Sequence, residues 1–129
     1  APPIRLDADP ENQRAFGYAN FGSPYEGPPG CLHGGWVAAS FDEVLGFVNS
    51  LTGNPGMTAR LTVNYRKPTP LYTDLRFEAF IDRVEGRKTF THCHLYAGDV
   101  LTAEGEGLFV SVDGEKFLEW IRKRRGATD

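Results

Sequence analysis

The most informative segment of this chain is Gly27-Pro28-Pro29-Gly30-Cys31-Leu32-His33-Gly34-Gly35, a loop that runs directly into a predicted helix. The two prolines keep the loop out of a helix, because a proline ring fixes φ and supplies no N–H donor. The two glycines at its end stand where the first backbone N–H groups of a helix have no partner within the helix. These groups lie at the positive end of the helix dipole, so the segment predicts a cradle for a negatively charged oxygen.

Length, composition and charge limit the classes of protein to which the chain can belong. Its 129 residues, 40% hydrophobic and 24% charged, suit a single domain (1–129) with a real core. The 14 basic and 17 acidic residues leave a net charge of -3, which argues against a nucleic-acid binder with a basic surface. Any phosphate-binding site must therefore be local.

Cysteine content and the lack of long apolar runs favour a cytoplasmic protein. Cys31 and Cys93 occur without a signal-type apolar N-terminus, which suits free thiols in a reducing compartment. No apolar run approaches the ~20 residues that span a bilayer, so we expect no membrane partner.

Apolar residues at helical spacing predict a helix from Trp36 to about Leu51, ending at a cluster of helix breakers over residues 52–56. The neighbouring face of this helix carries mainly very small side chains, so another group can approach Asp42 closely. The apolar face consists of Val37, Phe41, Val44, Leu45 and Val48, and the small-residue face of Gly35, Ala38, Ala39, Asp42 and Gly46.

After the helix, the apolar period changes to two, which predicts strands over about 57–66, 75–81, 89–97 and 100–112, joined by short turns. Gly105 and Gly107 in the last strand indicate a bend or a close backbone approach. Residues 115–125 predict a terminal amphipathic helix, and residues 1–30 an extended N-terminal lead-in that docks aromatic anchors. The fold class is α+β, an antiparallel sheet wrapped around one long helix.

These motifs resemble the hotdog-fold acyl-CoA thioesterases, specifically those of the phenylacetate-pathway and thioesterase-superfamily type. The likeness covers most of residues 27–112, through His33-Gly34-Gly35, Asp42 nine positions after His33, Asn54-Pro55-Gly56, the segment 64–71 and the hairpin 85–88. It implies that a backbone N–H of the His-Gly-Gly segment holds a thioester carbonyl. It also implies that Asp42 acts as general base or nucleophile and that Thr58 lies near the attacking water. Some members carry an amide side chain where this chain has Gly27.

The implied chemistry needs a stabilised oxyanion and an activated water. Backbone N–H groups of Gly34 and Gly35 would supply the first, and Asp42, in a partly dry environment that favours its protonated form, the second. The eight residue steps from Gly34 to Asp42 span roughly 12 Å of helix, too far for both to reach one carbonyl. We therefore expect an obligate homodimer with two shared sites, alternatively paired into a homotetramer.

Coenzyme A carries phosphates, so the implied substrate requires local cations. The candidates are Arg66, Lys67, Arg87 and Lys88, with residues 122–125 as a second group, and a solvated strand end or turn is the alternative interpretation. An acyl pocket could be lined by aromatic residues that could equally form the core: Phe16, Phe21, Trp36, Phe41, Phe47 and Phe80.

Several side chains have a structural interpretation beside a functional one. His33 is expected to hold the loop by hydrogen bonds rather than to act as a base, and Cys31 to be structural. Glu43 is the rival of Asp42 but points about 100° away from it. His92 and His94 share a strand face, yet the sequence offers no third ligand at a suitable spacing, so we expect no metal and no cofactor. The alternative functions are a non-catalytic acyl-CoA or lipid-binding protein and a hotdog hydratase.

Overall fold

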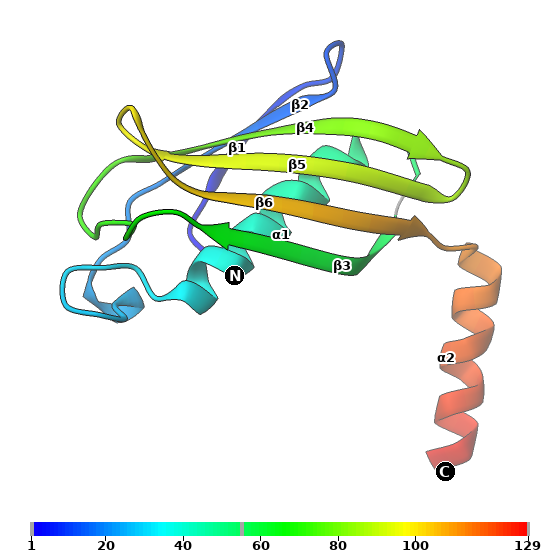
Figure 1. Ribbon diagram of the computed structural model, residues 1–129. Helices are drawn as coiled ribbons and strands as arrows, with labels where there is room; N and C mark the ends of the chain where they lie inside the picture. Colours follow the sequence, from blue (N-terminus) through cyan, green and yellow to red (C-terminus); the bar gives the residue numbers. More distant parts are fainter. Residues whose placement is uncertain (1, 55, 129) are drawn as a thin grey trace.

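One long helix lies against one face of an antiparallel sheet in the computed structural model, which describes residues 2–54 and 56–128 (Figure 1). In this described part of the chain the sheet has six strands in the order β1-β2-β4-β5-β6-β3. The strands are β1 (Arg5–Asp9), β2 (Arg14–Ala19), β3 (Gly56–Tyr65), β4 (Leu75–Glu85), β5 (Lys88–Ala97) and β6 (Val100–Ser111). The helices are α1 (Gly34–Ser50), α2 (Gly114–Thr128) and the short 3-10 helix η1 (Ser23–Tyr25).

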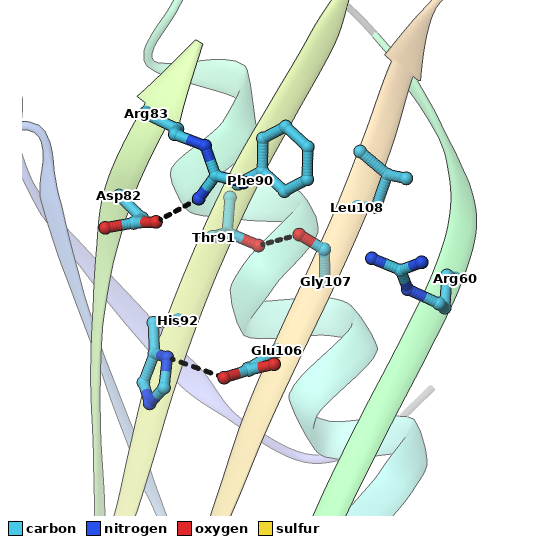
Figure 2. A pocket seen from close by; sticks show the side chains of 9 residues that line it. All are labelled: Arg60, Asp82, Arg83, Phe90, Thr91, His92, Glu106, Gly107 and Leu108. Atoms are coloured by element: carbon cyan, nitrogen blue, oxygen red, sulfur yellow. Dashed lines mark hydrogen bonds and ion pairs between the residues drawn. The ribbon is translucent and has the colours of Figure 1, made fainter. Parts of the chain in front are cut away.

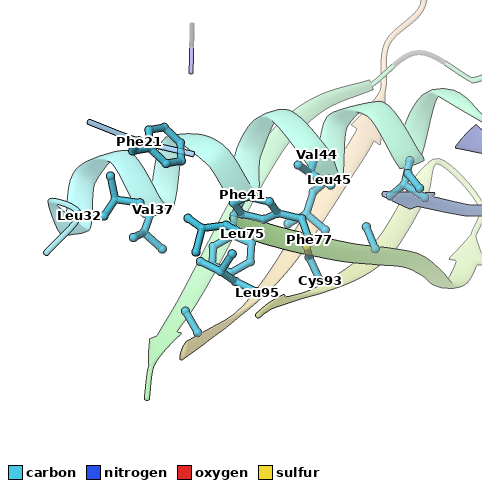
Figure 3. Packing of buried hydrophobic residues seen from close by; sticks show 14 of the residues in the cluster. Phe21, Leu32, Val37, Phe41, Val44, Leu45, Leu75, Phe77, Cys93 and Leu95 are labelled. Atoms are coloured by element: carbon cyan, nitrogen blue, oxygen red, sulfur yellow. The ribbon is translucent and has the colours of Figure 1, made fainter. Parts of the chain in front are cut away.

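The apolar face predicted for the central helix forms the core of the fold. All five of its members are buried, and they pack against the inward side chains of the sheet (Figure 3). The rings of Phe41 on α1 and Phe77 on β4 meet edge to face, with centroids 5.8 Å apart. The helical spacing in the sequence therefore predicted the packed face correctly. Pro55, within the predicted breaker cluster, lies outside the described residues.

The two glycines of β6 allow α1 to lie close to the sheet. A Cβ added at Gly105 would lie 2.8 Å from ring atoms of Phe41, and one at Gly107 would lie 3.2 Å from Cδ1 of Leu45, both on α1. No real Cβ makes contacts as short as the first without displacing its neighbour. The close backbone approach expected from the sequence is thus confirmed.

The N-terminal region differs from the prediction, because residues 1–30 contain a β-hairpin as well as extended chain. β2 pairs with both β1 and β4, so this hairpin extends the sheet. The inward positions of β2 carry only small residues: a Cβ at Gly17 would lie 3.0 Å from Ile4 and 3.1 Å from Val44. Crowding by the helix therefore leaves no room for the large apolar residues whose alternation normally indicates a strand.

The aromatic anchors expected in the N-terminal region divide between two environments. Phe21 is fully buried, and Tyr25 contacts both Phe21 and Trp36 edge to face. Phe16 and Tyr18 alternate with the inward-facing Ala15 and Gly17 on β2, and an arginine guanidinium lies over each ring. Only the first group anchors the lead-in to the core.

Two elements, β3 and α2, lie at the periphery of the fold. β3 forms an edge of the sheet with most of its side chains exposed, including Tyr65. The predicted C-terminal helix is present as α2, and it extends away from the sheet (Figure 1).

Candidate active site

His33 caps the N-terminus of α1 and determines which backbone donors remain available. Its Nδ1 accepts a hydrogen bond of 2.9 Å from the N–H of Gly35, while its carbonyl accepts from Trp36. This confirms that the ring holds the loop, as expected. It also means that the Gly35 N–H, predicted as an oxyanion donor, already has a partner.

The backbone N–H of Gly34, unlike that of Gly35, has no partner among the described residues. The Gly34 carbonyl, by contrast, accepts a hydrogen bond of 2.7 Å from the Tyr65 hydroxyl on β3. Gly34 also lines a hollow of about 370 Å³ together with Cys31, Val37 and Lys67. An unpaired N–H at a helix N-terminus, on a residue that lines a hollow, is an arrangement suited to bind an oxyanion.

Asp42 and Thr58 form the second element of the site. The Thr58 hydroxyl on β3 donates a hydrogen bond of 2.8 Å to Oδ1 of Asp42 on α1. This brings together two residues that the sequence proposed separately, and it leaves Oδ2 of Asp42 for another partner. Glu43, the rival carboxylate, forms no hydrogen bond or ion pair with any residue that the structure describes.

The environment of Asp42 differs from the expected one. Its side chain is exposed, because this side of α1 is not covered by the chain's own sheet. A single chain therefore does not provide the partly dry surroundings that the small-residue face suggested.

The four candidate cations do not gather in one place. Arg66 and Lys67 follow the C-terminal end of β3, beside the Gly34 hollow. Arg87 and Lys88 lie at the opposite end of the sheet, where Lys88 pairs in register with Val110 and Thr58 with Phe109. The nine steps along β3 from Gly56 to Tyr65 correspond to roughly 30 Å.

Two of these cations already have partners within the chain. Arg66 donates from Nε and Nη2 to Oε2 of Glu104, and Arg87 donates from the same two atoms to the carbonyl of Ser111. Lys67 and Lys88 are exposed. The second basic group, residues 122–125, lies on α2, away from the sheet (Figure 1).

The aromatic and sulfur-containing candidates occupy different layers of the fold. Phe21 and Phe41 are core residues, and Trp36 and Phe47 are half-buried against that core. Phe80 faces the other side of the sheet, stacked on His92. Both cysteines are free thiols, as expected, and burial raises the pKa of the Cys93 thiol well above its ordinary value.

The prediction that no third ligand accompanies His92 and His94 is wrong. One ligand atom from each of His92, His94 and Glu104 lies within 4.8 Å of the others. Spacing along the chain could not reveal Glu104, because it lies on β6 and reaches the histidines only through the pairing of β6 with β5.

The antiparallel sheet wrapped around a long helix, with a His-Gly-Gly segment at the helix N-terminus, defines a hotdog fold. The model of the Thioesterase superfamily matches residues 29–104. The chain belongs to this family.

Curated relatives and solved structures agree with this assignment. The acyl-coenzyme A thioesterase THEM4 of Bos taurus is 42% identical over 98 residues, which cover 74% of this chain and 40% of that protein. A crystal structure of a thioesterase superfamily protein superposes with a TM-score of 0.80 at 39% identity, covering 85% of this chain and 57% of the other. A Streptococcus mutans protein bound to acetyl-CoA has a TM-score of 0.79 over 84% of this chain and 88% of its own, but 15% identity, so it shows the fold alone.

This chain spans less than half the length of its curated relatives. Among the described residues, the structure contains no helix of sufficient length and apolar character to cross a bilayer.

Proposed function

We propose that this chain is an acyl-CoA thioesterase domain that hydrolyses acyl-CoA to a free acid and CoA at a site shared by two protomers. The observation that carries the proposal is that one helix carries two parts of an active site, which we call half-sites. The first is the unpaired Gly34 N–H at the start of α1, and the second is the Thr58-bound carboxylate of Asp42 farther along. Relatives that are described as acyl-coenzyme A thioesterases support the substrate class.

Each half-site has one task in the reaction. The Gly34 N–H would donate to the thioester oxygen, which becomes negative as the carbonyl carbon turns tetrahedral. Asp42 would either take a proton from the attacking water or attack the carbonyl itself, and both alternatives remain open. The Thr58 hydroxyl, by binding Oδ1, would orient the carboxylate so that Oδ2 faces the substrate. CoA leaves as the thiol after it gains a proton.

The two half-sites require a second chain. They lie roughly 12 Å apart along α1, and only the Gly34 end opens onto the hollow of about 370 Å³. If two protomers pair through their exposed β3 edges in antiparallel orientation, the Gly34 end of one meets the Asp42 end of the other. The same pairing would cover Asp42, which is exposed in a single chain.

The distribution of cations supports the same assembly. Antiparallel pairing would bring Lys67 of one protomer toward Arg87 and Lys88 at the opposite end of its mate. Four cations that are separated into two groups in one chain would then converge on each shared site. A negatively charged CoA could be bound there despite the net charge of -3 of the chain. We propose a homodimer as the working unit, with a tetramer of two dimers as the alternative assembly.

The test is hydrolysis of a panel of acyl-CoA esters, followed as thiol release with correction for the protein's own cysteines. Asp42→Asn should abolish thiol release while CoA-ester binding persists. Glu43→Gln is the matched control, because it removes the neighbouring carboxylate and leaves the Asp42–Thr58 pair intact. Binding without release would favour the non-catalytic alternative, and an absorbance change with an enoyl-CoA would favour a hydratase.

A further inference from the structure

Two histidines and two glutamates face one another on the side of the sheet that α1 does not cover. His94 on β5 lies in register with Glu104 on β6, and His92 lies in register with Glu106. The residue between the histidines, Cys93, is fully buried and faces the helix. Because side chains alternate along a strand, the strand pairing itself brings these four polar groups to the same outer surface.

The distances within this group suit a metal ion. Nε2 of His94 lies 3.2 Å from Oε1 of Glu104, and one atom from each of His92, His94 and Glu104 lies within 4.8 Å of the others. Two ligands of a tetrahedral zinc ion, each about 2.0–2.1 Å from the metal, are about 3.3 Å apart. Small side-chain rotations would therefore bring the third ligand into range.

Neighbouring residues hold the three candidates in suitable orientations. Arg66 binds only Oε2 of Glu104, so Oε1 is left facing His94. Nδ1 of His92 lies 3.5 Å from Oε1 of Glu106, which leaves Nε2 as the ligand atom. A carboxylate on the far nitrogen of a metal-binding histidine is a usual feature of such sites, because it determines the tautomer and raises the basicity of the ring.

The histidine rings are restrained by packing and remain accessible from solvent. His92 stacks on Phe80 with ring centroids 5.4 Å apart, and its own centroid lies 5.0 Å from that of His94. The side chains of His92 and His94 are 25% and 29% exposed, so an ion could reach them.

A hollow adjoins His92 and Glu106 on this face. It has a volume of about 180 Å³, and Arg60, Asp82, Arg83, His92 and Glu106 are among its lining residues (Figure 2). It lies on the Glu106 side of His92 and is not lined by His94 or Glu104.

From this geometry we propose that His92, His94 and Glu104 bind a divalent transition-metal ion of the zinc type, with Glu106 as the outer partner of His92. Two imidazoles and one carboxylate form a ligand set that zinc commonly takes, with water in the remaining position. The site lies on the opposite face of the sheet from α1, and Arg66, which binds Glu104, also lines the hollow beside Gly34.

The test is a zinc titration of the full chain, prepared without a polyhistidine tag and stripped of metal by a chelator. Calorimetry should give one ion per chain, and Co²⁺ should produce a visible ligand-field spectrum. His94→Gln and Glu104→Gln should each weaken binding by more than the roughly 10–100-fold that loss of an outer partner costs, and Glu106→Gln by about that amount. Glu119→Gln, which removes an exposed carboxylate on α2, is the matched control and should bind zinc normally.

Histidine NMR signals of the unmodified chain give a readout that needs no variant. Zinc should shift the ring signals of His92 and His94 and leave those of His33, which caps α1, in place. The inference is overturned if the chain binds no zinc, if zinc shifts His33 instead, or if a folded His92→Gln/His94→Gln variant retains the original affinity.

Discussion

A mixing experiment with two variants, each expected to be inactive, tests the proposed shared active site directly. Gly34→Pro removes the N–H that would bind the oxyanion, and the backbone should accept it. Gly34 is the first residue of α1, where proline is tolerated, and His33 before it has φ -61 and ψ 135, the extended conformation that a following proline requires. A Cβ at this position would lie 3.5 Å from the Tyr65 hydroxyl, which is an ordinary contact.

The expected size of each defect follows from the role of the lost group. Loss of one oxyanion donor costs about 10²–10³ in kcat, and loss of a general base about 10²–10⁴. Gly34→Pro and Asp42→Asn should therefore each retain no more than about 1% of wild-type activity. Gly34→Ala adds a side chain but keeps the N–H, so comparison with Gly34→Pro isolates the donor.

Mixing should restore activity by a predictable amount. In a mixed dimer one shared site carries both defects, and the other combines an intact Gly34 with an intact Asp42. Equal amounts of the two variants, unfolded and refolded together, give half mixed dimers with one working site of two, hence about a quarter of wild-type activity. Thiol release from an acyl-CoA is the assay, with each variant refolded alone for comparison. A mixture no more active than its parents would refute the split site.

Four further outcomes are expected. Thr58→Val keeps the side-chain shape but removes the donor to Asp42, so kcat should fall on the order of 10-fold with little change in KM, measured by steady-state kinetics; an unchanged kcat would rule out an orienting role. Gly105→Ala should lower the free energy of unfolding by about 1–3 kcal/mol in urea titrations, because its Cβ would lie 2.8 Å from the Phe41 ring; a neutral result would mean that α1 shifts at no cost. Cys31 should react with a disulfide reagent in the native chain and Cys93 only after unfolding, because burial raises the pKa of the Cys93 thiol. Because the pKa of the Cys93 thiol is raised only in the folded state, this thiol loses its proton at a lower pH in the unfolded chain than in the folded one. The free energy of unfolding should therefore decrease as the pH rises above about 8.5, and Cys93→Ala should flatten this dependence.

Most elements of the fold could be predicted from local patterns. The helix from residue 34 to 50, four of the strands and the terminal helix all have a clear period of apolar residues. The hairpin of β1 and β2 could not be found in this way, because the inward positions of β2 carry Ala15 and Gly17 rather than large apolar residues. What excludes larger side chains there is the proximity of Ile4 and Val44, a tertiary contact that local periodicity does not encode.

The site was predictable to a similar extent. The positions of Asp42 and Gly34 followed from a motif and a helix start, and their separation followed from the helical rise alone. The sequence could not show that the Gly35 N–H is taken by His33, since that depends on a side-chain rotamer. Nor could it show that Thr58 reaches Asp42 from a strand sixteen residues later in the chain.

The amino-acid sequence alone therefore determined which residues can form helix and strand, and which chemical groups the helix start and its carboxylate supply. Helix and strand periods depend on neighbours a few residues apart, so they can be read along the chain. Tertiary structure decided which groups meet across strands. Glu104 lies beside His94, and the cations divide between the two ends of the sheet, because strand register places residues that are distant in sequence next to one another.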